Sequence, residues 1–284
     1  MNLISIQSHV AYGHVGNSAA VFALQRLGCE VWPVHTVQFS NHTGHRSWKG
    51  EVFPAATISE IIDGMAELGV LSACDGVLSG YIGAVETGEA IVAAVARVKA
   101  ANPNASYCCD PVIGNRSRGE FVRPGIAEFM RVRAIPAAQV VTPNHFELDR
   151  LAGRETRSLT AVLRAVDDIH ARGPRAVLVT SVRSDETPDD SLDVIASDSS
   201  GRYLVRTPLL ATPANGAGDL IAAVFFFHYL GSGSAANALA DATSSLFGLL
   251  RRTREAGASE MVLIAAQDEL VTPSRKFTPI KIGL

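Results

Sequence analysis

Short runs of apolar, often β-branched residues alternate along this 284-residue sequence with longer segments of helical periodicity. We predict strands from the runs at 3–7, 30–39, 75–80, 106–110, 139–143 and 175–181. Most of these runs are apolar throughout, which is typical of strands buried on both faces of a parallel sheet. Strands that alternate with helices in this way predict an α/β fold with a central, mainly parallel, doubly wound sheet.

The segments between and after the strands predict the helices that cover this sheet. Helical periodicity covers 17–28, 57–69, 86–101, 145–152, 158–171, 218–230 and 234–252. The stretches 190–198 and 201–208 predict an antiparallel hairpin at the sheet edge, and 46–53 predicts a small hairpin or flap. Because no linker, repeat or low-complexity tract interrupts the pattern, we expect one domain over residues 1–284.

Composition excludes several classes of protein. The chain is 47% hydrophobic and 19% charged, as expected of a globular protein, and a net charge of −3 without a basic stripe argues against nucleic-acid binding. The four cysteines form no CxxC pair, which indicates a reduced, cytoplasmic protein. The start MNLISIQS does not resemble a signal peptide, and the apolar run 220–230 is too short to cross a membrane.

A glycine-rich loop, NGAGD, precedes the apolar helix at 218–230. Glycines at a helix N-terminus let an anion approach the unpaired backbone N–H groups closely. Asp219 at this position has two interpretations. It is either a carboxylate that complements the helix dipole or a general base that takes a proton from a substrate hydroxyl as that oxygen attacks a phosphoryl group.

Two polar stretches follow the first two strands. The stretch 7–17, QSHVAYGHVGN, is either a strand–helix joint capped by Asn17 or Ser18, or one wall of a small-molecule pocket, which we favour. The stretch 36–48 holds His42 and His45, but no third metal ligand is near them in sequence. We therefore interpret this second stretch as a recognition loop over the pocket rather than a transition-metal site.

Two further strands end in acidic stretches. Asp110 follows the strand at 106–110, where a carboxylate either caps a turn or faces Mg²⁺ through water. In TPNHFEL (142–148), Asn144 and Glu147 have the spacing of a capping box, which does not prevent Glu147 from also facing a metal. Since the carboxyl ends of parallel strands meet at one edge of a sheet, we expect all these stretches to converge there.

Together these motifs resemble pyridoxal kinases of the ribokinase-like superfamily. NGAGDLIAA is similar to the anion-hole loop of the superfamily, and six other stretches resemble the pyridoxal kinase family more narrowly. These are IQSHVAYGHVGNSAA, TVQFSNHTG, VLSGYIG, CCDPVIG, TPNHFEL and AAQDEL. The resemblance extends from Ile4 to about Leu270 and is closest to the bacterial salvage enzymes, which act as homodimers.

The resemblance implies a role for each matching position. Asp219 would deprotonate the 5′-hydroxyl of pyridoxal, and the N–H groups of Gly216, Ala217 and Gly218 would form the anion hole. The positions that match pyridoxal contacts are Ser8, Thr43, Gly44 and Tyr81. The positions that match ATP contacts are Asp110, Thr142, Glu147, Thr180, Thr207, Pro208, Leu209 and Leu210, with Asp110 and Glu147 also facing Mg²⁺. The loop 114–122 matches a cover over ATP, with Arg116 or Arg118 near the phosphates, and K⁺ is an optional further cofactor.

The sequence departs from the family at the nucleotide side. Thr180 stands where family members commonly carry a lysine, Asn215 replaces a more usual Val or Thr, and the segment between Pro208 and Gly216 is short. A neutral hydroxyl cannot neutralise a phosphate charge, which predicts weaker use of ATP. Two alternatives follow: a kinase of the same fold for hydroxymethylpyrimidine or a sugar, and a protein that binds pyridoxal or its phosphate with little catalysis.

Overall fold

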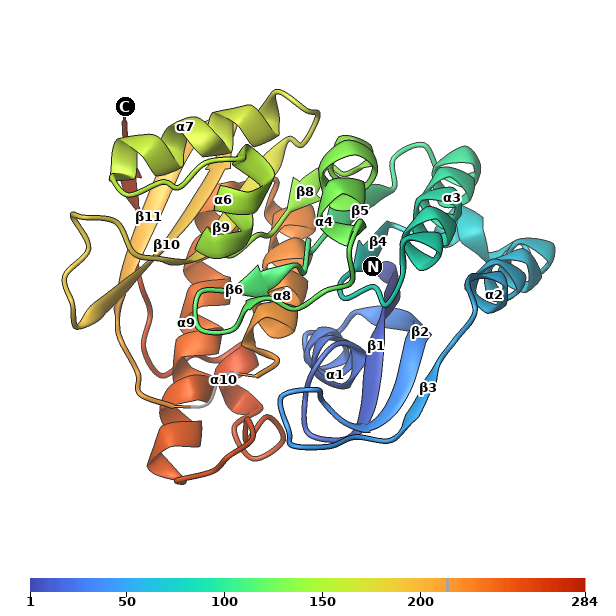
Figure 1. The fold of residues 1–284 in the computed structure, drawn as a ribbon, viewed down its shortest axis with the longest axis horizontal. Coiled ribbons are helices and arrows are strands. Elements are labelled where there is room, and N and C mark those ends of the chain that lie inside the picture. Colours follow the sequence, from blue (N-terminus) through green and yellow to red (C-terminus); the bar gives the residue numbers. More distant parts are fainter. Residues whose placement is uncertain (213–214, 284) are drawn as a thin grey trace.

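A mixed sheet of ten strands forms the centre of the computed structural model, which describes residues 1–212 and 215–283 (Figure 1). The strands of the sheet are β1 (Asn2–Tyr12), β2 (Glu30–Asn41), β3 (Gly50–Val52), β4 (Gly76–Ser79), β5 (Ser106–Cys109), β8 (Val140–Val141), β9 (Ala176–Val182), β10 (Ser191–Asp198), β11 (Gly201–Pro208) and β12 (Ile280–Ile282). They lie in the order β12-β11-β10-β9-β8-β5-β4-β1-β2-β3. The pairs from β9 to β2 are parallel, whereas β3 at one end and β10 to β12 at the other are antiparallel. The predicted mainly parallel sheet is therefore confirmed.

Helices cover both faces of this sheet. They are α1 (Asn17–Arg26), α2 (Ala55–Glu67), α3 (Val85–Ala101), α4 (Ile126–Phe129), α5 (Ile135–Ala137), α6 (His145–Ala152), α7 (Leu159–His170), α8 (Ala217–Ser232), α9 (Ala235–Glu255) and α10 (Asp268–Val271). Helices α2, α3, α4, α6 and α7 pack on one face and α1, α8 and α9 on the other. Successive strand residues supply the two layers: Ile4 and Ile6 face the first group, and Leu3 faces the second.

The first strand is longer than the sequence predicts. β1 continues to Tyr12, so the stretch from Ser8 to Tyr12, which was expected to be loop, pairs with β2 after an irregularity at Gln7 and Ser8. Parallel pairing with β2 keeps residues 8–12 extended beyond the apolar run at 3–7. They therefore lie at the carboxyl end of the sheet, where the pocket opens.

The alternative interpretation of 7–17, in which Asn17 or Ser18 caps the first helix, is wrong. Helix α1 begins at Asn17, its cap position is Gly16, and no side chain caps it. The Asn17 amide is buried and instead donates to the carbonyl oxygens of Ser5 and Val34, while its oxygen accepts from the Ser5 hydroxyl. Ser18 bonds to the backbone of Val10. Tertiary hydrogen bonds thus take the place of local capping.

Several short elements have no clear sequence signal. Residues 126–137 form α4, a π-helical turn (Met130–Ala134) and α5, and residues 280–282 pair with β11 as the edge strand β12. The predicted hairpin β10–β11 is confirmed, but β12 lies outside it at the edge. Residues 50–52 of the expected flap pair with β2 as β3. These pieces are too short to show a period in sequence.

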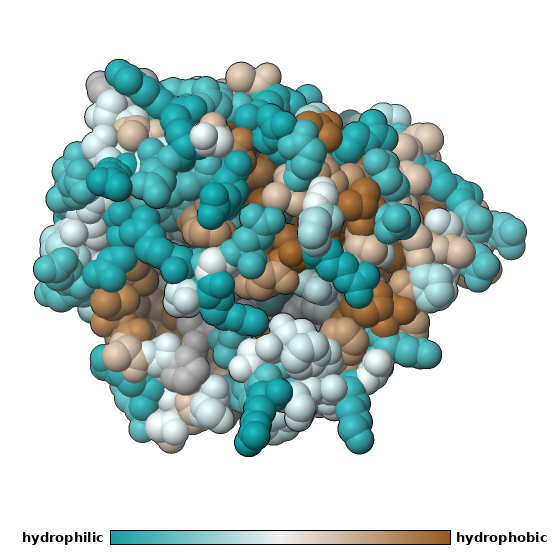
Figure 2. Space-filling model, viewed as in Figure 1, coloured by the Kyte–Doolittle hydropathy of each residue, from teal (hydrophilic) through white to brown (hydrophobic). Residues whose placement is uncertain are grey.

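The described helices include none that is long and apolar enough to cross a membrane. The space-filling view shows the molecule hollowed near the middle of one face, between the loop 114–122 and the loops that follow β1 and β2 (Figure 2). This hollow lies at the carboxyl ends of the parallel strands, as expected for a doubly wound sheet.

Candidate active site

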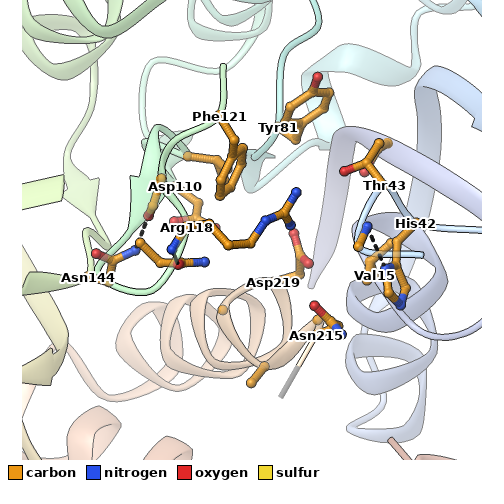
Figure 3. Close-up of a pocket in the computed structure, with 18 of the residues that line it drawn as sticks. Val15, His42, Thr43, Tyr81, Asp110, Arg118, Phe121, Asn144, Asn215 and Asp219 are labelled. Atoms are coloured by element: carbon orange, nitrogen blue, oxygen red, sulfur yellow. Dashed lines mark hydrogen bonds between the residues drawn. The ribbon is translucent and has the colours of Figure 1, made fainter. Parts of the chain in front are cut away.

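The hollow is a cavity of about 340 Å³ that gathers residues from the ends of six strands, β1, β2, β4, β5, β8 and β9. Twelve predicted site residues line it: Ser8, Thr43, Gly44, Tyr81, Asp110, Thr142, Glu147, Thr180, Gly216, Ala217, Gly218 and Asp219. They come from parts of the chain more than 200 residues apart. The fold therefore brings together the positions that the sequence assigned to separate motifs (Figure 3).

A second, smaller hollow of about 150 Å³ adjoins the first. Thr180, Ser181 and Ala217 line both, and three of the four positions at 207–210 that match ATP contacts, Thr207, Pro208 and Leu210, line the second. The fourth, Leu209, lines neither hollow and its side chain is 40% exposed. Leu209 follows the end of β11, and its N–H donates to the Asp190 carbonyl oxygen.

The N-terminus of α8 faces the cavity from below. Gly216 occupies the cap position with a left-handed φ of 82°, and a Cβ at this residue would overlap the carbonyl oxygen of His14. A glycine is required because the loop after β1 crosses the helix end at this close distance. Gly216, Ala217 and Gly218 line the cavity at the start of this 16-residue helix, where unpaired backbone N–H groups can donate to an anion.

Asp219 lies in the first turn of this helix, and its carboxylate points into the cavity (Figure 3). Burial raises the pKa of Asp219, while the N–H groups of Gly16 and of Asp219 itself lower it in part. A carboxylate with a raised pKa is a better proton acceptor than an exposed one. The geometry therefore supports a base beside an anion site.

Two more carboxylates lie on the opposite wall. Burial raises the pKa of Asp110 well above its usual value, and the charges of Glu147 and Asp219 raise it further. The Thr142 hydroxyl donates to Asp110 at 3.1 Å. Burial also raises the pKa of Glu147 to about 7. Asp219 disfavours the ionised forms of Asp110 and Glu147, and Mg²⁺ bound with a nucleotide would offset this negative charge.

Glu147 also has a structural role. Asn144 caps α6 by accepting from the Glu147 N–H, and the Glu147 carboxylate accepts from the Asn144 N–H at 2.8 Å. The predicted capping box is therefore confirmed. Its other oxygen accepts from the N–H groups of Ile113 and Gly114, which joins α6 to the loop after β5.

The acidic wall fits a hydrated magnesium ion better than a fully coordinated one. Asp110, Glu147 and Asp219 do not bring three ligand atoms within 4.8 Å of one another in the described part of the chain. Mg²⁺ keeps several of its waters and is often held by one or two carboxylates together with substrate phosphates. Asp110 is the better direct ligand, because backbone N–H groups already occupy both oxygens of Glu147.

The other end of the cavity is partly apolar. Val10, Val15, Val37 and Phe39 line it beside Ser8, Thr43 and Tyr81. An apolar wall with a few hydroxyl and backbone groups suits a flat aromatic ring with polar substituents. The motif 7–17 predicts a pocket wall, but its polar residues do not predict that Val10 and Val15 would line the cavity.

The rest of that motif does not face the cavity. Asn17, Ser18 and His9 take part in hydrogen bonds inside the protein, and His9 stacks on His35 at 4.3 Å. The high density of polar residues in 7–17 therefore serves two purposes. Ser8, Val10 and Val15 line the pocket, and Asn17 connects β1, β2 and α1.

A two-stranded ribbon, β6 (Gly114–Asn115) and β7 (Gly119–Glu120), covers the cavity from the side of Asp110 (Figure 3). Of the two arginines expected near phosphate, Arg118 lines the cavity, whereas Arg116 donates to His145 Nδ1 at 3.4 Å. Phe121 also lines the cavity and lies under the Arg118 guanidinium at 4.9 Å. No pattern in the sequence predicts this position of Phe121.

Ser181 is a further residue that sequence reasoning missed. It lies at the wall between the two hollows and has a φ of 54°, which makes it the non-glycine residue with a left-handed backbone among the residues described. Such a conformation costs free energy and is often found at functional sites. No feature of LVTS in the sequence signals it.

Comparison with known proteins identifies the family. The family model described as phosphomethylpyrimidine kinase matches residues 36–263. Proteins named pyridoxal kinase PdxY are 54% identical to the chain in Granulibacter bethesdensis, over 98% of both chains, and 52% identical in Rubrobacter xylanophilus, over 98% of this chain and 96% of the other.

Solved structures agree with the sequence comparison. Pyridoxal kinase from Leishmania donovani in complex with ADP and pyridoxamine has a TM-score of 0.91 and 29% identity, and covers 98% of this chain and 99% of its own. The complex of the same enzyme with ADP and pyridoxine has a TM-score of 0.90, with 30% identity over the same shares of the two chains. The chain therefore belongs to the pyridoxal kinase family and has the ribokinase-like fold.

Proposed function

We propose that the chain transfers the γ-phosphoryl group of ATP to the 5′-hydroxyl of pyridoxal and so makes pyridoxal 5′-phosphate in vitamin B6 salvage. One observation carries the proposal: a raised-pKa carboxylate, Asp219, lies in the first turn of a helix whose open N–H groups share a cavity with an acidic wall and an apolar wall. These are the parts that phosphoryl transfer to an alcohol requires.

Each wall has a separate task in this scheme. The apolar wall with Ser8, Thr43, Gly44 and Tyr81 holds the pyridine ring so that its 5′-hydroxyl faces Asp219. Asp219 takes the hydroxyl proton as the oxygen attacks phosphorus. The N–H groups of Gly216, Ala217 and Gly218 stabilise the charge on the transferred phosphoryl oxygens.

The nucleotide occupies the other side. Its phosphates lie between the α8 N-terminus and the wall with Asp110, Thr142 and Glu147, where Asp110 and Glu147 would face a Mg²⁺ ion that neutralises phosphate charge. Thr180 lies at the wall between the hollows, and adenine enters the second hollow beside Thr207, Pro208 and Leu210. Arg118 on the β6–β7 ribbon supplies positive charge over the phosphates.

Two other functions compete with this one. The description of the matching family model favours a kinase for a pyrimidine alcohol of the same fold, and Thr180 in place of a lysine favours a binding protein with little catalysis. Turnover of pyridoxal, hydroxymethylpyrimidine and a sugar, measured side by side, distinguishes a pyridoxal kinase from a kinase for another alcohol. ATP-dependent turnover of pyridoxal by the wild type separates the second.

The decisive experiment replaces Asp219 by Asn. We expect kcat for pyridoxal to fall by about 10²–10⁴-fold, the usual contribution of a general base, while pyridoxal binding measured by calorimetry is retained. Asp268→Asn is the matched control, because that side chain is 90% exposed and pairs with Arg26 far from the cavity. Equal kcat values for wild type and Asp219→Asn would refute the role of the base.

Three further properties belong to this proposal. We propose that the enzyme is a homodimer in the cytoplasm, as the resemblance implies, and that K⁺ raises its activity in addition to Mg²⁺. Light scattering on the purified enzyme tests the dimer, and replacement of K⁺ by tetramethylammonium tests the monovalent cation. Turnover with EDTA in place of Mg²⁺ is expected to be abolished.

A further inference from the structure

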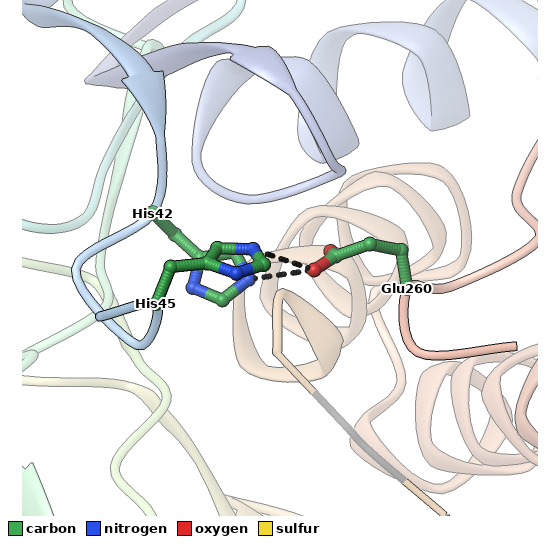
Figure 4. A group of neighbouring side chains, drawn as sticks. All are labelled: His42, His45 and Glu260. Atoms are coloured by element: carbon green, nitrogen blue, oxygen red, sulfur yellow. Dashed lines mark hydrogen bonds and ion pairs between the residues drawn. The ribbon is translucent and has the colours of Figure 1, made fainter. Parts of the chain in front are cut away.

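Two histidines and a distant glutamate converge beside the cavity. His42 and His45 follow β2, and Glu260 lies in the segment after α9 (Figure 4). The Nε2 atom of His42 is 2.9 Å from Glu260 Oε1, and the Nε2 atom of His45 is 3.0 Å from the same oxygen. The fold thus supplies the carboxylate that is missing near the two histidines in sequence.

We propose that His42, His45 and Glu260 form a site for a transition-metal ion, with Zn²⁺ as the best fit. Two imidazole nitrogens and one carboxylate oxygen are a ligand set that protein zinc sites use when the fourth position stays open. Zinc bonds of about 2.0–2.2 Å place neighbouring ligands of a tetrahedral site roughly 3.3–3.5 Å apart. The two nitrogen–oxygen separations, 2.9 and 3.0 Å, are a few tenths of an ångström shorter than this, and all three ligand atoms lie within 4.8 Å of one another.

The surroundings of Glu260 favour a cation. Its side chain is only 12% exposed, and Oε2 is buried without a hydrogen-bond partner in the described structure. Gly13 leaves the space for this oxygen, since a Cβ there would lie 2.7 Å from it. A buried carboxylate is costly unless a positive charge accompanies it, and imidazoles carry charge only when protonated.

Hydrogen bonds within the loop explain the metal-free arrangement. The Gly44 N–H donates to His42 Nδ1 at 3.1 Å, so the neutral His42 ring carries its proton on Nε2 and donates it to Glu260. A metal on Nε2 requires that proton to move to Nδ1, and the Gly44 N–H then loses its acceptor. Metal binding is therefore coupled to a rearrangement at Thr43 and Gly44, which line the cavity.

Other candidate zinc ligands are poorly placed. All four cysteines are buried in the interior, and burial raises the pKa of each thiol. Thiolates bind zinc, so thiols with a raised pKa do not compete while the protein is folded. His228 Nδ1 lies 3.5 Å from Asp241 Oδ2, but this pair offers one imidazole and not the two that the proposed site has.

The direct test measures binding of Zn²⁺ to the full chain without nucleotide by isothermal titration calorimetry. We expect one equivalent to bind the wild type and both His45→Phe and Glu260→Gln to weaken binding by more than about tenfold, since even outer-shell losses cost about 10–100-fold. Phenylalanine keeps a ring with its centroid 4.3 Å from that of His42, and glutamine keeps an oxygen that accepts from both histidine rings or from the one that remains. Both variants should therefore fold.

His228→Gln is the matched control and is expected to bind Zn²⁺ like the wild type. Co²⁺ added in place of Zn²⁺ should give the visible absorption of a tetrahedral site in the wild type, and His45→Phe should lack it. Absence of saturable Zn²⁺ binding to the wild type would overturn the proposal. Equal affinity of wild type and Glu260→Gln would overturn it as well.

The coupling to Gly44 gives a second readout, which rests on the proposed kinase function. We expect Zn²⁺ to raise KM for pyridoxal several-fold in the wild type and to leave KM of His45→Phe unchanged. Equal inhibition of the two proteins would place the ion at the nucleotide and refute the coupling. The binding experiments remain decisive for the metal site itself even if pyridoxal proves not to be the substrate.

Discussion

The carboxyl group of Glu147 predicts a pH dependence of stability with a definite sign. Its ordinary pKa is 4.5, and burial raises the pKa of Glu147 to about 7 in the folded protein. The folded state therefore binds this proton more tightly than the unfolded state does. The stabilisation by the bound proton is fully present below about pH 4.5 and is lost as the pH rises through about 7.

The size of the effect follows from the two pKa values. A tenfold change in proton affinity corresponds to about 1.4 kcal/mol, so the full difference is worth about 3 kcal/mol. Between pH 5 and pH 8, Glu147 alone should lower the free energy of unfolding by about 2.5 kcal/mol. For a chain of 284 residues this corresponds to roughly 5 °C in Tm.

The variant Glu147→Gln isolates this contribution. Glutamine is neutral at every pH, and it also removes the charge that raises the pKa of Asp110. We therefore expect Tm, measured by differential scanning fluorimetry from pH 5 to pH 8, to fall more steeply in the wild type than in the variant. Glutamine keeps only one of the two acceptor oxygens of Glu147, and the loss of the other lowers Tm by a similar amount at each pH, so the comparison of slopes is not affected.

A cation at the acidic wall should reverse the trend. Because Mg²⁺ stabilises ionised carboxylates, saturating Mg²⁺ and ADP should raise Tm of the wild type more at pH 8 than at pH 5. Parallel Tm curves for wild type and Glu147→Gln without ligand would refute the assignment of a raised pKa to this carboxyl.

Three other changes test separate parts of the site. Gly216→Ala places a methyl group against the His14 carbonyl oxygen at a left-handed φ; we expect kcat to drop by more than about tenfold, whereas Gly231→Ala, which has open space around it in the same helix, should keep wild-type kcat. Thr180→Lys should lower KM for ATP by placing a positive charge at the phosphates; an unchanged or higher KM would show that no phosphate lies there. Asn17→Ala leaves the Ser5 and Val34 partners unpaired in the interior and should cost about 2–4 kcal/mol in urea unfolding; a loss below about 1 kcal/mol would mean that water replaces the amide.

Much of the sheet could be predicted because its strands are long or wholly apolar. The helices at 86–101 and 145–152 match α3 and α6 within one residue, since Asn102-Pro103 ends the first and the Asn144–Glu147 capping box begins the second. The sequence missed β12 and the turns at 126–137, which are held by tertiary contacts rather than by local preference. Asn17 shows the same limit: a residue with a high capping preference satisfies its hydrogen bonds across two strands instead.

The candidate site could be predicted to the extent that its motifs lie at strand ends. Parallel strands bring such ends together, which is why twelve expected residues share one cavity. Glu260 could not be found in this way, because it lies 218 residues from His42 and belongs to no strand end. The left-handed backbone of Ser181 and the exposure of the Leu209 side chain could not be predicted either, because both depend on local backbone geometry that residue types alone do not determine.

The strand order has a consequence for how the chain folds as it is synthesised. The strands β3, β2, β1, β4 and β5 are adjacent and all precede residue 110, so half of the sheet can form early. The face of this half that carries α1 packs against α8, which is made only after residue 216. We expect a nascent chain of this length to expose a broad apolar surface and to need a chaperone until the helix that carries Asp219 emerges from the ribosome.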